Sequence, residues 1–230
     1  MKGMVSLITG ASGGLGVPVT RALLDAGSIV VGVSPKIRPS DFNHENFTAL
    51  PATIDGLPAA NKIADFVMGR FGRIDVLAHL VGGFAGGKAV ADIDDNSFQR
   101  MFDLNVNTAF HMLRAVIPHM RKAGYGRIIG MGSRAAHYPG ANVAAYSASK
   151  AAFGSLMRTA ALENKDAGIT VNAILPSTID TAANRNAMPG ADTSTWVKPA
   201  TIASLIIWLA RDAANDVTGS EIPVYGGLPT

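Results

Sequence analysis

The chain has 230 residues, of which 48% are hydrophobic and 16% charged, with a formal net charge of +3, so its length and apolar content fit one continuous domain, 1–230. No Lys/Arg cluster or basic stripe interleaved with aromatic residues is present, so we expect no nucleic-acid partner. The longest apolar stretch, 202–210, is far shorter than the roughly 20 residues of a membrane span, so we expect no membrane anchor. Zero cysteines exclude disulfides and fit the cytoplasm, and five scattered histidines without ligand spacing indicate no metal.

Apolar segments and helical patterns alternate along the chain. Strands are predicted at 4–8, 28–33, 48–52, 74–80, 126–132, 169–175 and 221–224, and helices at 15–26, 58–71, 97–122, 145–166 and 199–212. This alternation predicts an α/β fold of the Rossmann type, in which a doubly wound parallel sheet carries helices on both faces. Ligands of such sheets bind beyond the carboxyl ends of the strands.

The first predicted strand runs directly into the glycine-rich turn TGASGGLG at 9–16. Glycine lets the backbone turn sharply and approach a ligand, and the N-terminus of the following helix offers unpaired N–H groups and a positive dipole end to a pyrophosphate. The alternative is a tight turn that needs glycine for steric reasons only. We predict a dinucleotide site formed by Gly10, Ser12, Gly13, Gly14, Leu15 and Gly16.

The second predicted strand ends in Val33-Ser34-Pro35-Lys36-Ile37-Arg38 and lacks a carboxylate there. An acidic residue at this place would bind the ribose hydroxyls of NAD and repel a 2′-phosphate. Ser34, Lys36 and Arg38 could instead bind that phosphate. The sequence therefore predicts NADP(H) as the preferred cofactor, with NAD(H) as the alternative if this segment is only a solvated loop.

His79 ends the fourth predicted strand. A histidine there could be a ligand or a catalyst, but buried polar groups are normally hydrogen-bonded, so we expect a structural role.

A tyrosine and a lysine four residues apart, Tyr146 and Lys150, fall within the helix predicted at 145–166. This spacing places both side chains on one helix face. An ammonium beside a phenol favours the phenolate and lowers its pKa from about 10 toward neutrality. Ser133 could hydrogen-bond the same substrate oxygen and polarise a carbonyl. The pattern predicts a proton-donating site; a helix with a surface lysine and a half-buried tyrosine is the alternative.

Taken together, these segments resemble the short-chain dehydrogenase/reductase family over essentially the whole chain. The resemblance rests on the glycine turn, Asp103-Leu104-Asn105, Ser133, Tyr146 with Lys150, and Val171-Asn172-Ala173-Ile174-Leu175-Pro176, in that order. It implies a catalytic tetrad of Asn105, Ser133, Tyr146 and Lys150, in which Lys150 also holds the nicotinamide ribose and Asn105 supports a proton relay through water. It further implies cofactor contacts from Val81, Gly82, Tyr146, Lys150, Pro176, Thr178 and Ile179, and a homotetramer or homodimer built through the helices of Asn105 and Tyr146 and the C-terminal strand.

A narrower resemblance to dihydropteridine reductases lies in 81–87, in 175–181, and at Asn184, Arg185, Met188 and Trp196. Those reductases lack the serine that stands here as Ser133. The resemblance to the wider family therefore implies NAD(P)(H)-dependent hydride transfer to a ketone or aldehyde, with reduction of a quinonoid pterin as one alternative. A nucleotide-sensing protein without turnover is another, since a fold alone does not establish function.

The segment 180–198 is too long and too mixed in composition for a tight turn, and we predict a mobile lid over the nicotinamide. Trp196 either enters the substrate pocket or anchors the lid to the body of the protein. Phe84, Tyr138 and Met188 add apolar area, and Arg134 and Arg185 could each receive an anionic group.

Overall fold

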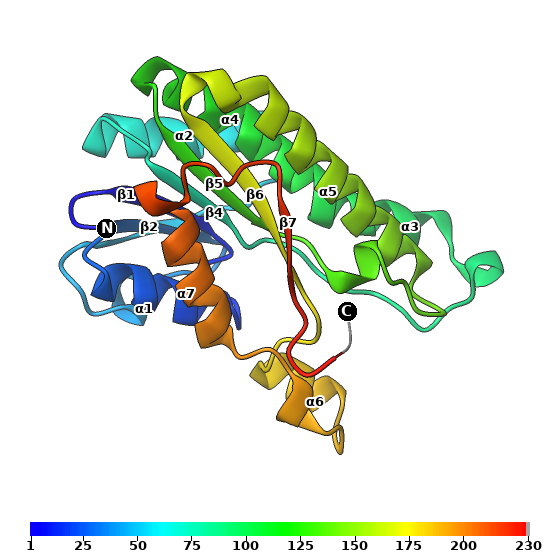
Figure 1. Cartoon of the computed structure of the whole chain (residues 1–230). Helices are drawn as coiled ribbons and strands as arrows, with labels where there is room; N and C mark the ends of the chain where they lie inside the picture. The colour runs from blue at the N-terminus through cyan, green and yellow to red at the C-terminus, as the bar shows by residue number, and fades with distance from the viewer. Residues whose placement is uncertain (229–230) are drawn as a thin grey trace.

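The computed structural model describes residues 1–228, in which seven parallel strands form one sheet in the order β3-β2-β1-β4-β5-β6-β7 (Figure 1). Every predicted strand is present, with ends that differ from the prediction by at most two residues. The strands are β1 (Val5–Thr9), β2 (Ile29–Ser34), β3 (Phe47–Pro51), β4 (Val76–His79), β5 (Gly126–Met131), β6 (Ile169–Pro176) and β7 (Glu221–Val224).

Helices cover both faces of the sheet (Figure 1). Helices α1 (Gly16–Asp25) and α7 (Pro199–Leu209) pack together on one face, and α2 (Leu57–Phe71), α4 (Thr108–Ala123) and α5 (Ala144–Asn164) cover the other, with α3 (Asp95–Phe102) against α5. The predicted doubly wound, single-domain Rossmann-type fold is confirmed.

The core consists of two layers because successive side chains of a strand point to opposite faces of the sheet. In β1, Leu7 packs with Met112 and Phe153 from α4 and α5, whereas Ile8 packs with Leu23 and Ile206 from α1 and α7. All six side chains are almost completely buried. This double burial explains why the strands are nearly continuous apolar runs.

Two departures from the predicted elements concern the site. The helix predicted at 97–122 is divided by a π-helical turn (Asp103–Asn107) between α3 and α4. A short helix, α6 (Ala182–Ala187), lies within the segment predicted as a lid. At six residues it is too short to show helical periodicity, although Thr181 caps it by accepting a hydrogen bond from the Asn184 amide at 3.3 Å.

The chain reverses its direction of strand addition between β1 and β4, so the loops after β1, β4, β5 and β6 meet at the carboxyl edge of the sheet. Within residues 1–228 no helix is both long and apolar enough to cross a membrane.

Candidate active site

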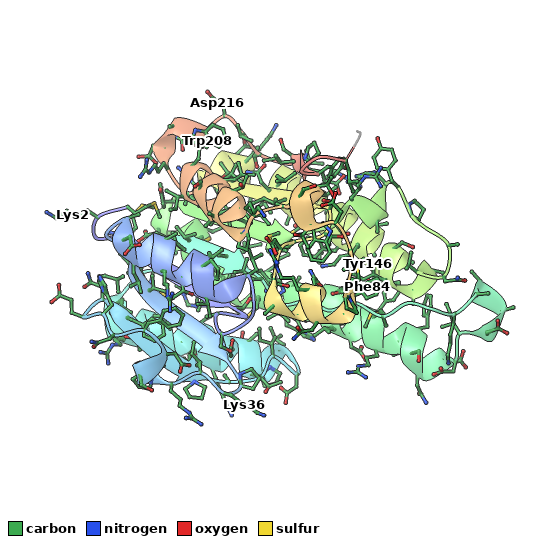
Figure 2. All side chains as sticks on the ribbon, turned by 90° about the horizontal axis from the view of Figure 1, so that it is seen from below. Lys2, Lys36, Phe84, Tyr146, Trp208 and Asp216 are labelled. Atoms are coloured by element: carbon green, nitrogen blue, oxygen red, sulfur yellow. The ribbon has the colours of Figure 1, made fainter. Side chains whose placement is uncertain are left out.

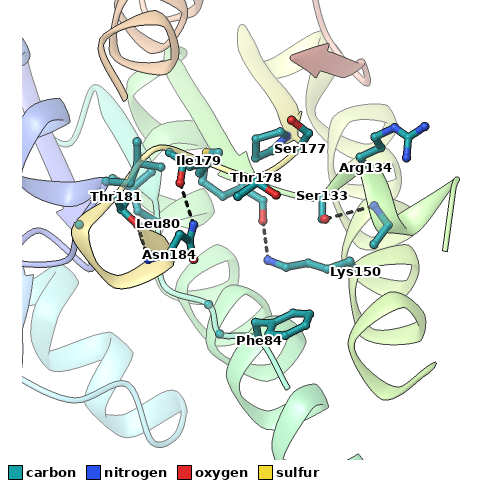
Figure 3. A pocket seen from close by; sticks show the side chains of 18 of the residues that line it. Leu80, Phe84, Ser133, Arg134, Lys150, Ser177, Thr178, Ile179, Thr181 and Asn184 are labelled. Carbon is teal, nitrogen blue, oxygen red and sulfur yellow. Dashed lines mark hydrogen bonds between the residues drawn. The ribbon is translucent and has the colours of Figure 1, made fainter. Parts of the chain in front are cut away.

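A cavity of about 570 Å³ opens at this edge of the sheet (Figure 3). The glycine turn forms one end of it, and Ser133 and Arg134, which follow β5, form the other. The predicted site residues that line it are Gly10, Gly13, Gly14, Leu15, Gly16, Val81, Gly82, Ser133, Tyr146, Lys150, Pro176, Thr178 and Ile179. The structure therefore brings together most of the residues that the sequence singled out.

The glycine turn fits a dinucleotide pyrophosphate. Gly10 has a positive φ of 75°, which favours glycine, and a Cβ on Gly16 would overlap the Gly10 carbonyl oxygen. The N-cap of α1 is Leu15, and within the described part of the chain no side chain caps this end of the helix, which faces the cavity. These features match the backbone cradle that binds phosphates at helix N-termini.

Three residues predicted to bind the cofactor are not part of the cavity lining: Ser12, Ser34 and Lys36. The Ser34 side chain is buried, and its Oγ accepts a hydrogen bond from the Ser12 amide at 3.1 Å. This hydrogen bond links Ser34, at the end of β2, to the backbone of the glycine turn. Lys36 is exposed on the protein surface (Figure 2), and its contact with a 2′-phosphate stays a prediction.

Ser133, Tyr146 and Lys150 converge from β5 and α5 on the cavity. Ser133 Oγ caps the short helical turn after it by accepting a hydrogen bond from the Ala135 amide at 3.2 Å. Lys150 Nζ donates to the Met131 carbonyl oxygen at 2.8 Å (Figure 3). The same nitrogen lies 6.0 Å from the centre of the Tyr146 ring. The strand end that precedes Ser133 therefore also fixes the lysine head group.

The electrostatics of this group differ from the prediction. Burial raises the pKa of the Tyr146 phenol, and the Ser133 hydroxyl only partly counteracts this. Burial also lowers the pKa of Lys150 to about 8. The prediction that the ammonium brings the phenol's pKa down is not met here, because loss of hydration dominates at both groups. The phenol stays protonated at neutral pH, which is the form that can donate a proton.

Asn105 lies beside the cavity rather than in its lining, almost fully buried in the π-helical turn. The Asn105 side chain forms two hydrogen bonds with the backbone of Gly83. Its Oδ1 accepts from the Gly83 N–H at 2.9 Å, and its Nδ2 donates to the Gly83 carbonyl oxygen at 3.1 Å. Nδ2 also donates to Ser149 Oγ at 3.0 Å, and that hydroxyl donates to the Tyr146 carbonyl at 2.7 Å. Asn105 thereby connects the loop after β4 to the helix of Tyr146.

His79 has the structural role that the sequence favoured. Its ring is buried, with Nδ1 2.9 Å from Thr9 Oγ1 and Nε2 3.3 Å from Thr108 Oγ1. The Thr108 hydroxyl donates to the Leu104 carbonyl at 2.8 Å, so it accepts from Nε2–H, and Nδ1 accepts from Thr9. Burial first, and Lys150 second, lower the pKa of His79 to about 3. A neutral His79 thus joins Thr9 at the end of β1 to Thr108 at the start of α4.

In the segment predicted as a lid, 180–198, a backbone hydrogen bond and ion pairs connect the two ends. The Asp180 amide donates to the Val197 carbonyl at 2.8 Å, and the Asp180 carboxylate pairs with Arg185 and Lys198. Trp196 is buried and does not line the cavity, whereas Met188 does. Trp196 therefore anchors the loop, which decides between the two roles left open by the sequence.

Some residues of the site escaped the sequence analysis. Ser149 connects Asn105 to Tyr146, and its place directly before Lys150 was the only available signal. No sequence pattern pointed to the further lining residues Leu80, Ala135, Ala183 and Leu228.

Comparison with known proteins agrees with this geometry. The family model described as short chain dehydrogenase matches residues 4–192. The 7alpha-hydroxysteroid dehydrogenase of Escherichia coli is 30% identical, over 99% of this chain and 94% of that protein. The D-beta-hydroxybutyrate dehydrogenase of Rhizobium meliloti is 29% identical, over 96% and 97%.

Among solved structures, the 3-ketoacyl-(acyl-carrier-protein) reductase of Brucella melitensis complexed with NADH superposes with a TM-score of 0.87, at 25% identity and 98% coverage of both chains. The structure titled ElxO with NADP bound shares the fold, with a TM-score of 0.91 at 24% identity over 99% of this chain and 98% of that chain.

The chain belongs to the short-chain dehydrogenase/reductase family. It is an NAD(P)(H)-dependent oxidoreductase that acts on CH–OH and C=O groups.

Proposed function

We propose that this protein interconverts a carbonyl compound and its alcohol with NADP(H), using Asn105, Ser133, Tyr146 and Lys150 as the catalytic tetrad. The observation that carries the proposal is the convergence of Ser133, Tyr146 and Lys150 on one cavity that also contains the glycine turn. The bound nicotinamide supplies or accepts the hydride. The glycine turn would hold its pyrophosphate, and Lys150 its ribose.

The protein's own contribution is to place and move a proton. Ser133 Oγ holds the substrate oxygen, and the protonated Tyr146 phenol donates to that oxygen as negative charge develops on it. Lys150, fixed by the Met131 carbonyl, stabilises the phenolate that remains. Asn105 fixes Gly83 and Ser149 around this group and supports the return of the proton through water.

The preference for NADP(H) over NAD(H) rests on the missing carboxylate after β2 and on exposed Lys36. The substrate is proposed to be a ketone or aldehyde of moderate size, covered by the lid at 180–198. The named relatives act on hydroxy-acid and hydroxysteroid substrates, which differ in size but share the same reacting group.

Reduction of a quinonoid pterin is the second candidate. It is favoured by the segments that resemble dihydropteridine reductases, because Phe84, Asn184 and Met188 line the cavity. Oxidation of NADPH and NADH, followed at 340 nm with a panel of aldehydes, ketones and quinonoid dihydropterin, separates the two. Absence of turnover on every compound, with cofactor binding retained, would instead indicate a nucleotide-sensing protein.

We also propose a cytoplasmic homotetramer or homodimer assembled through α3, α4 and α5 and the C-terminal strand. Apolar side chains exposed on these helices support assembly: Phe98 is 43%, Phe110 41% and Leu162 73% exposed. The lack of cysteine fits a reducing compartment. Light scattering coupled to size-exclusion chromatography measures the number of subunits.

A further inference from the structure

The carboxylate of Glu221 connects three segments that are far apart in the sequence. Glu221 is the first residue of β7, the strand at one edge of the sheet (Figure 1). Its Oε2 accepts a hydrogen bond from His137 Nε2 at 2.7 Å and lies 2.6 Å from Arg158 Nη1. The Glu221 side chain is 13% exposed, whereas those of His137 and Arg158 are 47% and 46% exposed. The carboxylate is therefore the centre of this cluster.

Gly154 in α5 leaves room for this carboxylate. A Cβ on Gly154 would overlap Glu221 Oε1, so a glycine is needed for the carboxylate to lie this close to the helix backbone. Glycine within a helix costs stability relative to alanine. The helix thus has an unfavourable residue at the place where the carboxylate packs against it.

His137 lies at the end of the turn that begins with Ser133. In this turn, 133–137, the Ala136 amide donates to the Ser133 carbonyl at 3.0 Å, and the His137 amide donates to the Arg134 carbonyl at 3.1 Å. These backbone hydrogen bonds join the two ends of the turn. A contact that holds the His137 ring therefore also holds the backbone of Ser133.

Arg158 belongs to the helix that carries the proposed proton donor. Tyr146 and Arg158 are both residues of α5, whose backbone hydrogen bonds make it a stiff element. A contact at Arg158 therefore helps to fix the position of Tyr146. Through its two partners, the Glu221 carboxylate holds both the turn of Ser133 and the helix of Tyr146.

We propose that Glu221 is a positioning residue that sets the distance between Ser133 and Tyr146, so that both groups meet one substrate oxygen. This deepens the proposed function and rests on it. Misplacing a catalytic group by about 1 Å can cost roughly 10²-fold in rate. Partly exposed ion pairs, in contrast, add little to stability. Loss of the Glu221 carboxylate should therefore affect turnover more than folding.

The first test is Glu221→Ala, assayed with the ketone or aldehyde that the wild type reduces fastest. It should lower kcat by at least about tenfold, because the Ser133 turn is released. The KM for this compound and the Kd of NADPH should change less than about twofold, since Glu221 is not among the described residues that line the cavity. Glu221→Gln should keep most of kcat, because an amide oxygen can accept from both donors.

Gly154→Ala tests the same contact without removing an ionisable group. The added methyl group displaces the Glu221 carboxylate, whereas alanine is the better helix former. The variant should lose kcat as Glu221→Ala does, with a melting temperature no lower than that of Glu221→Ala. Wild-type kcat in both variants would overturn the proposal.

Asp212→Ala is the matched control. The Asp212 carboxylate also joins distant segments, because it lies 3.1 Å from Arg127 Nη2 and accepts from the Tyr125 hydroxyl at 3.3 Å. It is not among the described residues that line the cavity. Asp212→Ala should therefore keep the kcat of the wild type, and a loss equal to that of Glu221→Ala would overturn the proposal.

A double-mutant cycle with Ser133→Ala shows whether Glu221 acts through Ser133. If it does, Glu221→Ala should have little further effect on the residual kcat of Ser133→Ala, because residues that act as a unit are not additive. Losses that multiply independently would overturn the proposal and leave Glu221 with a role in stability only.

Failure of the proposed function is distinguishable from failure of this inference. Hydrogen–deuterium exchange of the amides at 135–138 reports on the Ser133 turn without any substrate. Faster exchange there in Glu221→Ala and Gly154→Ala, with Asp212→Ala unchanged, supports the inference even if no carbonyl compound is reduced. Equal exchange in wild type and Glu221→Ala overturns it. Absence of turnover in the wild type contradicts the proposed function alone.

Discussion

The ring of Phe84 lies edge to face against the ring of Tyr146, with 5.0 Å between their centres and 72° between their planes. Phe84 belongs to the loop after β4, which Asn105 holds through Gly83, and it forms part of the cavity wall (Figures 2 and 3). The same loop therefore shapes the substrate space and removes water from one side of the proposed proton donor. We therefore expect the acidity of Tyr146 to depend on Phe84, a residue outside the proposed tetrad.

Replacing Phe84 by Ala should move the pH dependence of turnover to lower pH. Burial raises the pKa of Tyr146, so admitting water beside the phenol lowers that pKa toward its ordinary value. The pH profile of kcat measures the shift. Phe98→Ala, which removes an exposed aromatic ring of α3 outside the cavity, is the control. A midpoint that stays in place, or rises, would show that Phe84 does not desolvate the phenol.

Tyr146→Phe should lower turnover by roughly 10²–10⁴-fold, the contribution of a positioned general acid. The variant should bind NADPH as wild type does, because the ring and its packing are kept. Stopped-flow kinetics and a fluorescence titration of the cofactor measure the two effects separately. Tyr138→Phe removes another hydroxyl at the cavity and should have a much smaller effect. Comparable turnover in Tyr146→Phe and wild type would remove Tyr146 from the mechanism.

His79 makes stability depend on pH. Its pKa is about 3 in the folded protein and about 6.5 when unfolded, so the unfolded chain binds more protons between these values. The stabilisation is complete above pH 6.5 and is lost as pH falls toward 3, by about 2 kcal/mol between pH 7 and 5. Urea unfolding at both pH values should show this fall in wild type and a clearly smaller one in His79→Asn.

The matched control for this prediction is His44→Asn, which changes an exposed histidine. It should lose stability between pH 7 and 5 as wild type does. At pH 7, His79→Asn should itself cost about 1 kcal/mol, because asparagine is too short to keep the hydrogen bonds to both Thr9 and Thr108. Equal pH dependence in wild type and His79→Asn would contradict the neutral, buried state of this ring.

Lys36→Glu should weaken NADPH binding by about tenfold and NADH binding much less. The change replaces an attraction to the 2′-phosphate by a repulsion, and interactions of exposed charges are worth on the order of 1 kcal/mol. Fluorescence titration with both cofactors measures the difference, and Lys62→Glu, an exposed charge reversal on α2, is the control. Tighter binding of NADH than NADPH by the wild type would refute the proposed preference.

Trp196→Ala should reduce kcat/KM uniformly for substrates of different size, and should lower the free energy of unfolding by about 3–5 kcal/mol, the usual cost of removing a large buried aromatic side chain. Trp196 is buried at the end of the lid segment and is not among the described residues that line the cavity. Met188→Ala, which does change the lining, should instead affect bulky substrates most. A loss in Trp196→Ala confined to bulky ring compounds would place the indole in the pocket.

The sequence alone determined the order of strands and helices and most residues of the cavity. Strand positions follow from runs of apolar residues between turn signals, and the glycine turn and the Tyr146–Lys150 spacing are local patterns, so they can be read without contacts between distant segments. His79 was also assigned correctly, because a polar group at the end of a buried strand requires hydrogen-bond partners.

Only the tertiary structure decided how these groups act on one another. The partner of Lys150 is the Met131 carbonyl, 19 residues away, and the pKa of Tyr146 is raised because burial outweighs the nearby groups. The contact between Tyr225 and Arg134 brings the segment after β7 to a turn after β5. Such contacts join residues far apart in the chain, and the balance between desolvation and charge is set by the whole surrounding volume, which no local pattern encodes.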